Sequence, residues 1–267
     1  MNKTYGFIGV GSMGGALARA CCRAVGGKSV RVSNRTAEKA RSLAEELGCV
    51  ACTNDVIAAS CGFIFLGVKP QLMAEALEPL RGTLRARDDG FVLVSMAAGL
   101  TMEKICALAG GDYPVIRIMP NTPCAVGAGV VLYDTNSLVT EKQTRLFLDA
   151  MADAGVCDRL EERLIDAGSA VSGCGPAFVC EFIEALSDGG VACGLPRQKA
   201  LLYAAQTVLG TARLLLETGR HPAELKDAVC SPAGSTIAGV RVLEQRAMRG
   251  AVHDAAIAAC ERGRELG

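Results

Sequence analysis

The stretch Tyr5-Gly-Phe-Ile-Gly-Val-Gly-Ser-Met-Gly14 decides the fold of this chain. A short apolar run ends in Gly9, Gly11 and Gly14, which have the G-x-G-x-x-G spacing. A helical pattern follows at once, and then a second β-branched run at residues 29–33. This order of strand, glycine turn, helix and strand is the context in which the spacing indicates a dinucleotide site. The alternative is a glycine-rich turn that holds no ligand.

Each residue of the turn has a distinct expected role. Gly9 permits the tight turn, Gly11 lets a pyrophosphate approach the backbone, and Gly14 lets the helix lie close to the strand. The helix that begins near Ser12 and Met13 directs free N–H groups toward the phosphates. We therefore expect all five residues to contact a dinucleotide.

The end of the second strand indicates which dinucleotide binds. Sites that prefer NAD place an acid there, whereas this chain has Asn34, Arg35 and Thr36. An acid would repel a 2′-phosphate and an arginine would attract it. The three residues predict NADPH, with NADH as the second option. In the alternative interpretation Asn34 ends the strand, Thr36 caps the next helix and Arg35 is solvated.

The composition excludes several classes of protein. The chain has 267 residues, a formal net charge of zero and 50% hydrophobic residues, which allows two domains with a sizeable core. Balanced charge gives no reason to expect nucleic acid or an anionic membrane as a partner. No apolar run approaches the ~20 residues of a membrane span, and the N-terminus lacks the layout of a signal peptide. We expect a cytoplasmic protein.

The cysteines and histidines do not indicate a metal site. The thirteen cysteines are scattered among apolar positions, as expected of buried or free thiols in a reducing compartment. Cys49 and Cys52 form a C-x-x-C, but no second pair accompanies them. The two histidines, His221 and His253, are far apart in the sequence. We therefore expect no metal and no histidine-based acid–base chemistry.

Strand-like and helical segments alternate as far as Arg159. Continuous apolar runs, typical of strands buried on both faces of a parallel sheet, lie at residues 62–68, 91–96 and 115–119. Further strands are expected at residues 49–52, 127–133 and 155–159, and helices at residues 37–47, 71–80, 101–109 and 141–154. The alternation predicts a doubly wound sheet, on which ligands bind at the carboxyl ends of the strands. Residues at those ends are Asn34, Asn54, Lys69, Ala98 and the segment 119–123.

From Glu161 onward the sequence has almost no strand pattern. Helices are expected from about residue 162 to 193 with a break at 172–176, and at residues 197–217, 223–229, 235–245 and 251–264. We therefore predict an α/β chain. A Rossmann-like dinucleotide-binding domain with a doubly wound sheet occupies residues 1–161, and an all-helical domain occupies residues 162–267.

Two of these helices are apolar around most of their circumference. Residues 177–186 and 200–216 carry alanine, leucine and cysteine on most sides. Such a helix must be buried on most sides, and about a hundred residues of helix cannot bury that much surface alone. A partner subunit is therefore expected. The alternative is a compact helical domain in a monomer.

A second candidate site lies at Cys230-Ser-Pro-Ala-Gly-Ser-Thr-Ile237. The free backbone amides of Ser235 and Thr236 at a helix start would suit a carboxylate, and Thr236 adds a hydroxyl that can donate and accept. From the residues alone, a helix start without a ligand is an equal alternative. The stretch 172–178 likewise has two interpretations, as a close helix junction or as the wall of a site.

Taken together, five blocks strongly resemble the pyrroline-5-carboxylate reductase family: the Gly9 fingerprint and the segments 68–70, 119–123, 171–178 and 227–237. They occur in the family's order over essentially the whole chain, and the last block is highly specific. The resemblance implies reduction of Δ1-pyrroline-5-carboxylate to L-proline with NAD(P)H, the last step of proline biosynthesis. It also implies a helical dimerisation domain and homodimers, which in the family often assemble into decamers.

The resemblance also implies roles for particular residues. Ser231 to Thr236, with Gly234 and Ser235, match the loop that holds the substrate carboxylate through backbone amides. Thr236 matches the threonine that bonds the ring nitrogen, which makes it the catalytic candidate. Asn54 matches an asparagine on the adenosine side of the cofactor. The remaining expected cofactor contacts are Val68, Lys69, Pro70, Ala98 and Gly99.

Two positions depart from the family pattern. Ala233 stands where glycine is common, and Cys174 where serine is frequent. Neither residue removes a necessary functional group, but a Cβ at position 233 narrows the backbone options of the loop.

The sequence offers no obvious general acid, and this absence fits the same activity. Reduction of a carbonyl needs an acid for the new alkoxide, and no His or Lys–Tyr pair suggests itself. A cyclic imine can bind already protonated, so the enzyme needs positioning and a hydrogen bond to nitrogen, which Thr236 provides. The alternatives are a hydroxyacid dehydrogenase with Lys199 or Lys226 as acid, another imine reductase, or a cofactor-sensing protein without catalysis.

Overall fold

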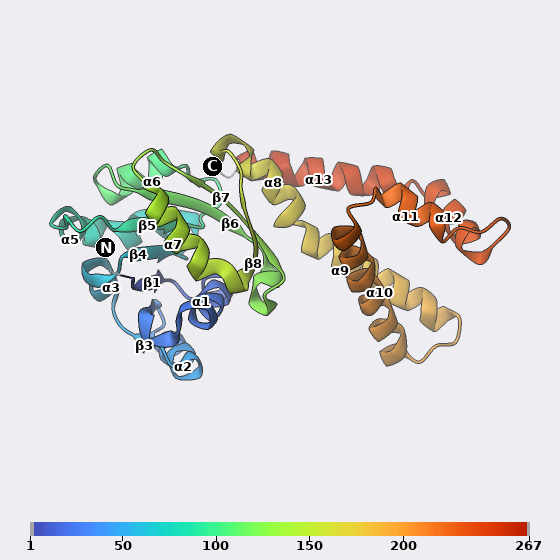
Figure 1. The fold of residues 1–267 in the computed structure, drawn as a ribbon, viewed down its shortest axis with the longest axis horizontal. Helices are drawn as coiled ribbons and strands as arrows, with labels where there is room; N and C mark the ends of the chain where they lie inside the picture. Colours follow the sequence, from blue (N-terminus) through green and yellow to red (C-terminus); the bar gives the residue numbers. More distant parts are fainter. Residues whose placement is uncertain (1–2, 266–267) are drawn as a thin grey trace. The chain divides into compact units, whose positions relative to one another are not determined.

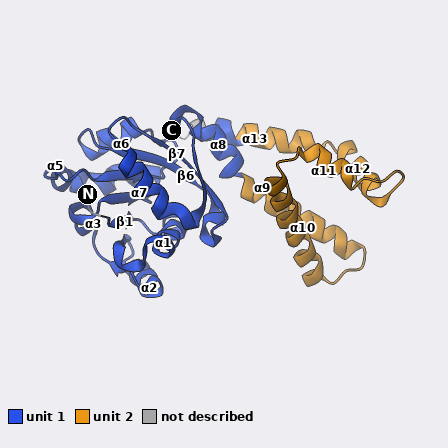
Figure 2. Ribbon diagram, in the orientation of Figure 1, with its two compact units in different colours: residues 1–174, 259–267 blue, residues 175–258 orange. Residues whose placement is uncertain are grey.

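The computed structural model describes residues 3–265 of the chain (Figure 1). The chain divides into two compact units (Figure 2). The first comprises residues 1–174 and 259–267, and the second comprises residues 175–258. The first unit contains the sheet, and the second is helical. A doubly wound sheet followed by a helical region confirms the predicted fold class.

The first unit is built on an eight-stranded sheet with the order β3-β2-β1-β4-β5-β6-β7-β8. Its strands are β1 (Tyr5–Ile8), β2 (Val30–Ser33), β3 (Val50–Ala51), β4 (Phe63–Leu66), β5 (Val92–Ser95), β6 (Val115–Pro120), β7 (Gly129–Thr135) and β8 (Gly155–Arg159). β1 pairs in parallel with β2 on one side and with β4 on the other. The strand order therefore reverses at β1, and the carboxyl ends of β1 and β4 form the switch point at which such sheets bind ligands.

β7 runs antiparallel to β6, a reversal that the sequence pattern did not predict. The connection from Pro120 to Gly129 contains only a short 3₁₀ helix, η4 (Thr122–Val126). A parallel crossover needs about a dozen residues or more, so this connection can only return the chain in the opposite direction. β8 then pairs in parallel with β7 and forms one edge of the sheet.

The helices of the first unit largely follow the predicted segments. They are α1 (Ser12–Val25), α2 (Ala37–Leu47), α3 (Asn54–Ser60), α4 (Met73–Leu77), α5 (Arg81–Arg85), α6 (Met102–Ala109), α7 (Glu141–Met151) and α8 (Ile165–Ser172). α2 ends at Gly48, which has the left-handed φ of 62° that favours glycine there. The Thr53 hydroxyl accepts a hydrogen bond from the backbone N–H of Val56 and caps α3.

The single helix expected at residues 71–80 is broken in the structure. Two 3₁₀ turns, η2 (Pro70–Leu72) and η3 (Glu78–Leu80), flank α4, and α5 follows directly. Pro79 is the physical reason, because it has no N–H to donate and its ring crowds the preceding turn. The segment therefore passes through this position as a tighter turn and resumes as α5.

Apolar side chains alternate between the two faces of the sheet, and helices cover both. Phe7 and Phe65 face the layer of α1, α2 and α7, where their rings stack with centroids 4.3 Å apart. Ile8 and Leu66, the next residues along the two strands, face the layer of α3, α4, α5 and α6. Full burial of each such side chain contributes roughly 1.5–3 kcal/mol. Burial on both faces explains why these strands are continuous apolar runs.

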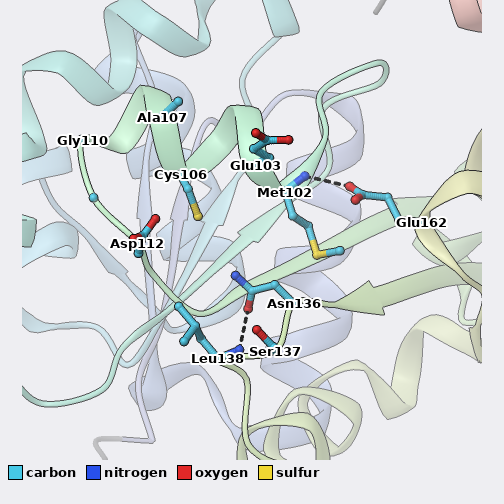
Figure 3. Close-up of a pocket in the computed structure, with 11 residues that line it drawn as sticks. Met102, Glu103, Cys106, Ala107, Gly110, Asp112, Asn136, Ser137, Leu138 and Glu162 are labelled. Atoms are coloured by element: carbon cyan, nitrogen blue, oxygen red, sulfur yellow. Dashed lines mark hydrogen bonds between the residues drawn. The ribbon is translucent and has the colours of Figure 1, made fainter.

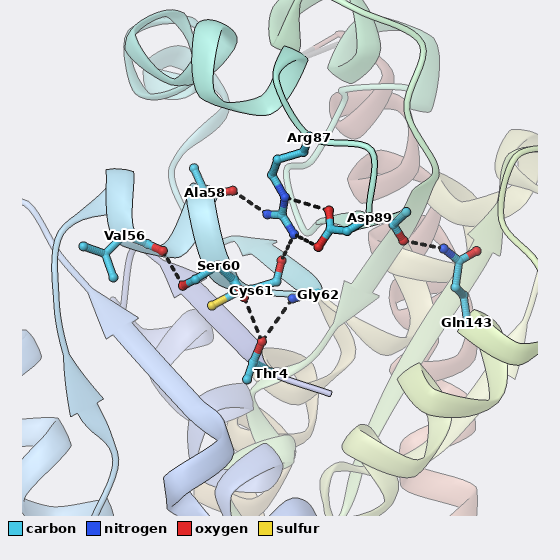
Figure 4. A network of polar contacts seen from close by, with 10 residues as sticks. Thr4, Val56, Ala58, Ser60, Cys61, Gly62, Arg87, Asp89 and Gln143 are labelled. Carbon is cyan, nitrogen blue, oxygen red and sulfur yellow. Dashed lines mark hydrogen bonds and ion pairs between the residues drawn. The ribbon is translucent and has the colours of Figure 1, made fainter. Parts of the chain in front are cut away.

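Polar contacts close the amino-terminal edge of the sheet (Figure 4). The Arg87 guanidinium donates to the carbonyl oxygen of Cys61 at 2.8 Å and pairs with Asp89 at 2.7 Å. The hydrogen bonds that Arg87 donates to Asp89 are the largest cause of the lowered pKa of the Asp89 carboxyl. The side-chain amide of Gln143 donates to the carbonyl oxygen of Gly90 at 2.8 Å. These contacts hold α3 and α7 to the segment before β5, at the end of the sheet opposite the switch point.

The second unit consists of α9 (Gly175–Ala192), α10 (Arg197–Thr218), α11 (Pro222–Ala228), α12 (Ser235–Gln245) and most of α13 (Met248–Glu265). α9 packs against α10. Gly190 permits a close approach, since a Cβ on it would lie 3.3 Å from the Cβ of Ala200. α13 begins before the expected residue 251, directly after Ala247, whose positive φ of 54° separates it from α12.

Most side chains of these helices are exposed in the single chain. Among the described residues of α9 to α12, only Ser187, Ala200 and Ala204 are buried. Leu216 of α10 is 80% exposed. The stretch Glu162–Ala192 is long and apolar enough, at 31 residues, to cross a membrane by length and composition alone, and 6% of its most apolar window is buried. The expectation that no segment approaches the length of a span is wrong for this stretch.

Candidate functional site

Three glycines pack against one another at the switch point of the sheet. Gly9 has a φ of 92°, and a Cβ on it would lie 2.7 Å from the carbonyl oxygen of Gly67. A Cβ on Gly14 or on Gly67 would collide with the carbonyl oxygen of Gly9. Gly11 differs, because no other atom lies within 4 Å of the position that its Cβ would take. The turn is closed at three glycines and open at Gly11, where a ligand can approach the backbone.

Two asparagines hold the ends of β1 and β2 in place beside this turn. The Oδ1 atom of Asn34 accepts a hydrogen bond from the backbone N–H of Val10 at 3.3 Å, and its amide donates to the carbonyl oxygen of Thr36 at 3.2 Å. The Oδ1 atom of Asn54 accepts from the hydroxyl of Ser33 at 2.6 Å. Asn34 and Asn54 therefore stabilise the ligand-facing loops through contacts within the chain.

A cavity of about 600 Å³ opens at the switch point. It brings together the predicted residues Gly9, Gly11, Asn34, Arg35, Thr36, Asn54, Val68 and Lys69. Ser12 lines an adjoining cavity of about 520 Å³ between α1 and α2. The predicted residues that line neither cavity are Met13, Gly14, Pro70, Ala98 and Gly99. Gly14 is buried behind the turn, and Ala98 and Gly99 form a turn after β5.

Several residues that line these cavities were not predicted from the sequence, and two of them, Gly67 and Lys39, matter most for a ligand. Gly67 directly follows β4 and packs against the carbonyl of Gly9. A glycine at the end of the apolar run, next to Val68, was the available signal. Lys39 lies in the first turn of α2 and lines both cavities. Its role depends on which elements meet at Gly11, and no local pattern indicates that.

Arg35 and Thr36 are both exposed at the end of β2. Thr36 is the N-cap residue of α2, but its side chain makes no capping hydrogen bond. The alternative interpretation of Thr36 as a helix cap is therefore correct for its position, but no side-chain hydrogen bond supports it. Arg35 pairs with no acidic side chain among residues 3–265. Both side chains are free to contact a ligand in the cavity that they line.

The thiols of the first unit are arranged differently from the C-x-x-C pattern. The Cys49 thiol has a hydrogen bond with Cys22 of α1, which lowers the pKa of Cys49. Burial raises the pKa of Cys52, the second residue of the motif. Cys49 therefore interacts with a cysteine outside the motif. Within residues 3–265, no group of three or more His, Cys, Asp or Glu side chains is placed to hold a metal ion.

The candidate substrate loop forms the start of α12 in the second unit. The backbone N–H of Gly234 donates to the carbonyl oxygen of Ser231 at 3.0 Å, and Gly234 is the N-cap residue of the helix. Ala233 has a φ of 60°, in the left-handed region that favours glycine. Ser231, Ser235 and Thr236 are exposed. In the single chain, the predicted substrate residues thus lie on an open helix start.

The stretch 172–178 is a helix junction. α8 ends at Ser172, and α9 begins at Gly175. A Cβ on Gly173 would lie 2.8 Å from the carbonyl oxygen of Ser169, so the close turn depends on glycine at this position. This geometry favours the first of the two interpretations of the stretch.

A further cavity, of about 700 Å³, lies along α6 (Figure 3). Glu103 and Cys106 line it from α6, and residues 136–138 line it from the loop after β7. Glu162 contributes a carboxylate that accepts a hydrogen bond from the backbone N–H of Met102 at 2.7 Å. None of the predicted cofactor or substrate residues lines this cavity.

The chain is similar to known proteins over its whole length. A family model described as pyrroline-5-carboxylate reductase dimerisation matches residues 162–266, and a model described as NADP oxidoreductase, coenzyme F420-dependent, matches residues 4–99. Pyrroline-5-carboxylate reductase of Escherichia coli (strain K12) is 38% identical over 270 residues, which cover 100% of this chain and 99% of the relative.

Solved structures give the same result. The Plasmodium falciparum pyrroline carboxylate reductase with NADP bound has a TM-score of 0.88 and 30% identity, covering 99% of this chain and 98% of that one. A pyrroline-5-carboxylate reductase from Coxiella burnetii has a TM-score of 0.90 and 30% identity, covering 100% of this chain and 99% of that one. The similarity therefore includes both units.

Proposed function

This chain belongs to the pyrroline-5-carboxylate reductase family, and we propose that it reduces Δ1-pyrroline-5-carboxylate to L-proline by hydride transfer from NADPH, with NADH as the second donor. The observation that carries this proposal is the identity of 38% to an enzyme of that name over the full length of both chains. The reaction is the last step of proline biosynthesis, and we place it in the cytoplasm.

The residues at the switch point fit a nicotinamide dinucleotide. The space at Gly11 admits a pyrophosphate next to the backbone, and the cavity of about 600 Å³ continues to the end of β2. There, Asn34, Arg35 and Thr36 offer neutral and positive donors and no acid, which suits a 2′-phosphate. When bound, the nicotinamide supplies the hydride. The other proposed contacts are Gly9, Ser12, Met13, Gly14, Asn54, Val68, Lys69, Pro70, Ala98 and Gly99.

The loop at the start of α12 is the proposed substrate site. The loop formed by Ser231, Gly234, Ser235 and Thr236 would hold the carboxylate, chiefly through the backbone amides of Ser235 and Thr236, because a helix start presents unpaired N–H groups. The hydroxyl of Thr236 would bond the ring nitrogen and orient the imine. A protonated imine that accepts a hydride at its carbon becomes a neutral secondary amine, so no further acid is needed. Thr236 is therefore the proposed catalytic residue, acting by position and hydrogen bonding.

A homodimer through the helical domain accounts for the exposed apolar surface. Leu202, Leu209 and Leu216 of α10 are 62%, 59% and 80% exposed in the single chain, and such a surface is typical of a subunit interface. The dimerisation family matches from residue 162, which supports a functional division into residues 1–161 and 162–267. We propose that a second copy covers this surface, that dimers assemble further into decamers, and that neither membrane nor nucleic acid is bound.

The test is an assay of the purified chain with NADPH and pyrroline-5-carboxylate, followed by the loss of NADPH absorbance. We expect turnover with the imine and none with hydroxyacids assayed in the oxidative direction with NADP⁺. Nucleotide binding without turnover of either substrate would refute the proposal in favour of a sensor. Light scattering at micromolar concentration should show dimers or larger assemblies, and an active monomer would contradict the proposed interface.

A further inference from the structure

Lys39 lies where two cavities of the first unit meet. The cavity of about 600 Å³ extends from the switch point to α3 and α4, and the cavity of about 520 Å³ extends between α1 and α2. The residues that line both are Gly11, Thr36 and Lys39. Lys39 thus stands beside the glycine that leaves room for a pyrophosphate and beside the end of β2, where the ribose hydroxyls of a dinucleotide are held in this fold.

Both acidic side chains that line the smaller cavity with Lys39 are paired with other cations. Glu46 forms an ion pair with Arg19 at 2.6 Å, and Glu38 lies 3.6 Å from Arg41. Lys39 forms no ion pair with any residue in the described part of the chain. Its ammonium group is exposed in the first turn of α2 and has no acidic side chain to compensate its charge.

Two of the three cations that line the larger cavity lie on its α2 side, and its acids come from other elements. Its acids, Asp55 and Glu75, come from α3 and α4, and one of its cations, Lys69, comes from the loop after β4. Its other two cations, Arg35 and Lys39, come from the end of β2 and the start of α2, which contribute no acid to this cavity. The two cations therefore favour an anion on the α2 side, whereas Lys69 offsets only part of the charge of Asp55 and Glu75 on the other side. This asymmetry locates the 2′-phosphate more closely than Arg35 alone does.

We propose that Lys39 is a second determinant of NADPH preference, which binds the 2′-phosphate together with Arg35. A phosphate monoester carries a charge of about −1.5 to −2 at neutral pH, so that one guanidinium leaves part of its charge uncompensated. Lys39 supplies the second positive charge from one helical turn further along the chain. This inference rests on the proposed function in one respect, namely that the cavity holds the cofactor of a reductase.

The test compares Lys39→Ala with the unchanged chain in binding rather than in turnover. The dissociation constants of NADPH and NADH are measured from the change in nucleotide fluorescence, and those of adenosine 2′,5′-bisphosphate and AMP by calorimetry. We expect Lys39→Ala to raise the dissociation constants of NADPH and the bisphosphate by about three- to tenfold, because an exposed charge-assisted contact is lost. NADH and AMP should change by less than about twofold, because they lack the 2′-phosphate.

Lys142→Ala is the matched control. Lys142 is also an exposed lysine in the first turn of a helix of 11 residues, α7, but it lines neither cavity. Lys142→Ala should leave all four dissociation constants unchanged. Arg35→Ala should resemble Lys39→Ala, and the double variant should bind NADPH no better than NADH. The preference for NADPH should also shrink as the salt concentration is raised.

Two results would overturn the inference: equal weakening of NADPH and NADH in Lys39→Ala, or no weakening of either. These results are distinguishable from failure of the proposed function. A chain that turns over pyrroline-5-carboxylate but binds NADPH equally well without Lys39 retains its function and refutes the inference. A chain with no turnover, in which Lys39→Ala still weakens NADPH selectively, refutes the function and leaves the role of Lys39 intact.

Discussion

Asn121 donates a hydrogen bond from its side-chain amide to the carbonyl oxygen of Ser172, 2.9 Å away. The Oδ1 atom of the same side chain accepts a hydrogen bond from the backbone N–H of Val130, also at 2.9 Å. One buried side chain thus joins the end of β6, the start of β7 and the last turn of α8. The arrangement of these three elements depends on both ends of a single amide.

Asn121→Ala should therefore destabilise the first unit. The variant leaves a backbone N–H and a backbone C=O without their partner, and each unpaired buried group costs about 1–3 kcal/mol. We expect the free energy of unfolding to fall by about 2 kcal/mol or more, measured by denaturant titration. Thr122→Ala, at the exposed neighbouring position, should change it by less than about 0.5 kcal/mol. An Asn121→Ala chain as stable as the parent would contradict this role.

Alanine at Gly11 and at Gly14 should separate cofactor binding from folding. The Cβ position of Gly11 is open, so Gly11→Ala should fold normally but weaken NADPH by about tenfold or more, because the methyl group occupies the space of the pyrophosphate. A Cβ on Gly14 would collide with the carbonyl oxygen of Gly9, so Gly14→Ala should also lower the melting temperature. Calorimetry and nucleotide titration on both variants distinguish the two effects. Equal stability loss in both variants would contradict the geometry of the turn.

Ala233 should respond in opposite ways to glycine and to valine. Its φ of 60° destabilises a non-glycine residue by roughly 1–2 kcal/mol. Glycine avoids this strain, but the greater flexibility of the unfolded chain that it causes costs roughly 0.5–1 kcal/mol. Ala233→Gly should keep turnover and stabilise by up to about 1 kcal/mol, whereas Ala233→Val should raise the KM for pyrroline-5-carboxylate.

Ala247, with a φ of 54° outside the loop, is the matched control for Ala233. Ala247→Gly should give a similar change in stability with no change in KM. Wild-type KM in Ala233→Val would show that the conformation of the loop is not important for substrate binding.

Substitutions at Thr236 test the role of its hydroxyl. Thr236→Ser keeps the hydroxyl and should retain most activity. Thr236→Val keeps the shape without the hydroxyl and should lose about three- to tenfold or more in kcat/KM, since a neutral hydrogen bond contributes about 0.5–1.5 kcal/mol. The dissociation constant of NADPH should be unchanged in both variants. Wild-type kcat and KM in Thr236→Val would show that the hydroxyl serves only the helix start.

The sequence was sufficient to predict those parts of the fold that depend on local interactions. The turn at Gly9, Gly11 and Gly14 follows from spacing and flanking strands, because each glycine acts on its immediate neighbours in the fold. The apolar runs of β4 and β5 identified buried strands, since burial on both faces leaves no alternation to be misread. The long helix expected at residues 197–217 also matches α10 closely, because local signals bound it, namely Pro196 before its first residue and Gly219 after its last.

The sequence was insufficient to predict the parts of the site that form where distant segments meet. Lys39 and Gly67 become part of the cavities only when α2 and β4 are placed beside Gly11 and Gly9. Asn121 was visible only as part of a family block, and its partner, Ser172, lies far along the chain. Pro79 was present in an otherwise helical pattern, and its local effect was outweighed by the apolar period in the prediction. The contacts of Lys39, Gly67 and Asn121 are tertiary effects that no local pattern contains. The break at Pro79, in contrast, is a local effect that the prediction gave too little weight.

The most direct test of the central claim is isotope transfer from NADPH to product. The purified chain is supplied with pyrroline-5-carboxylate and NADPH deuterated on either face of nicotinamide C4, and the proline formed is analysed by mass spectrometry. We expect L-proline with a single deuterium on the former imine carbon for one of the two labelled cofactors. Absence of L-proline, or L-proline without the label from either cofactor, would contradict hydride transfer from NADPH to the cyclic imine.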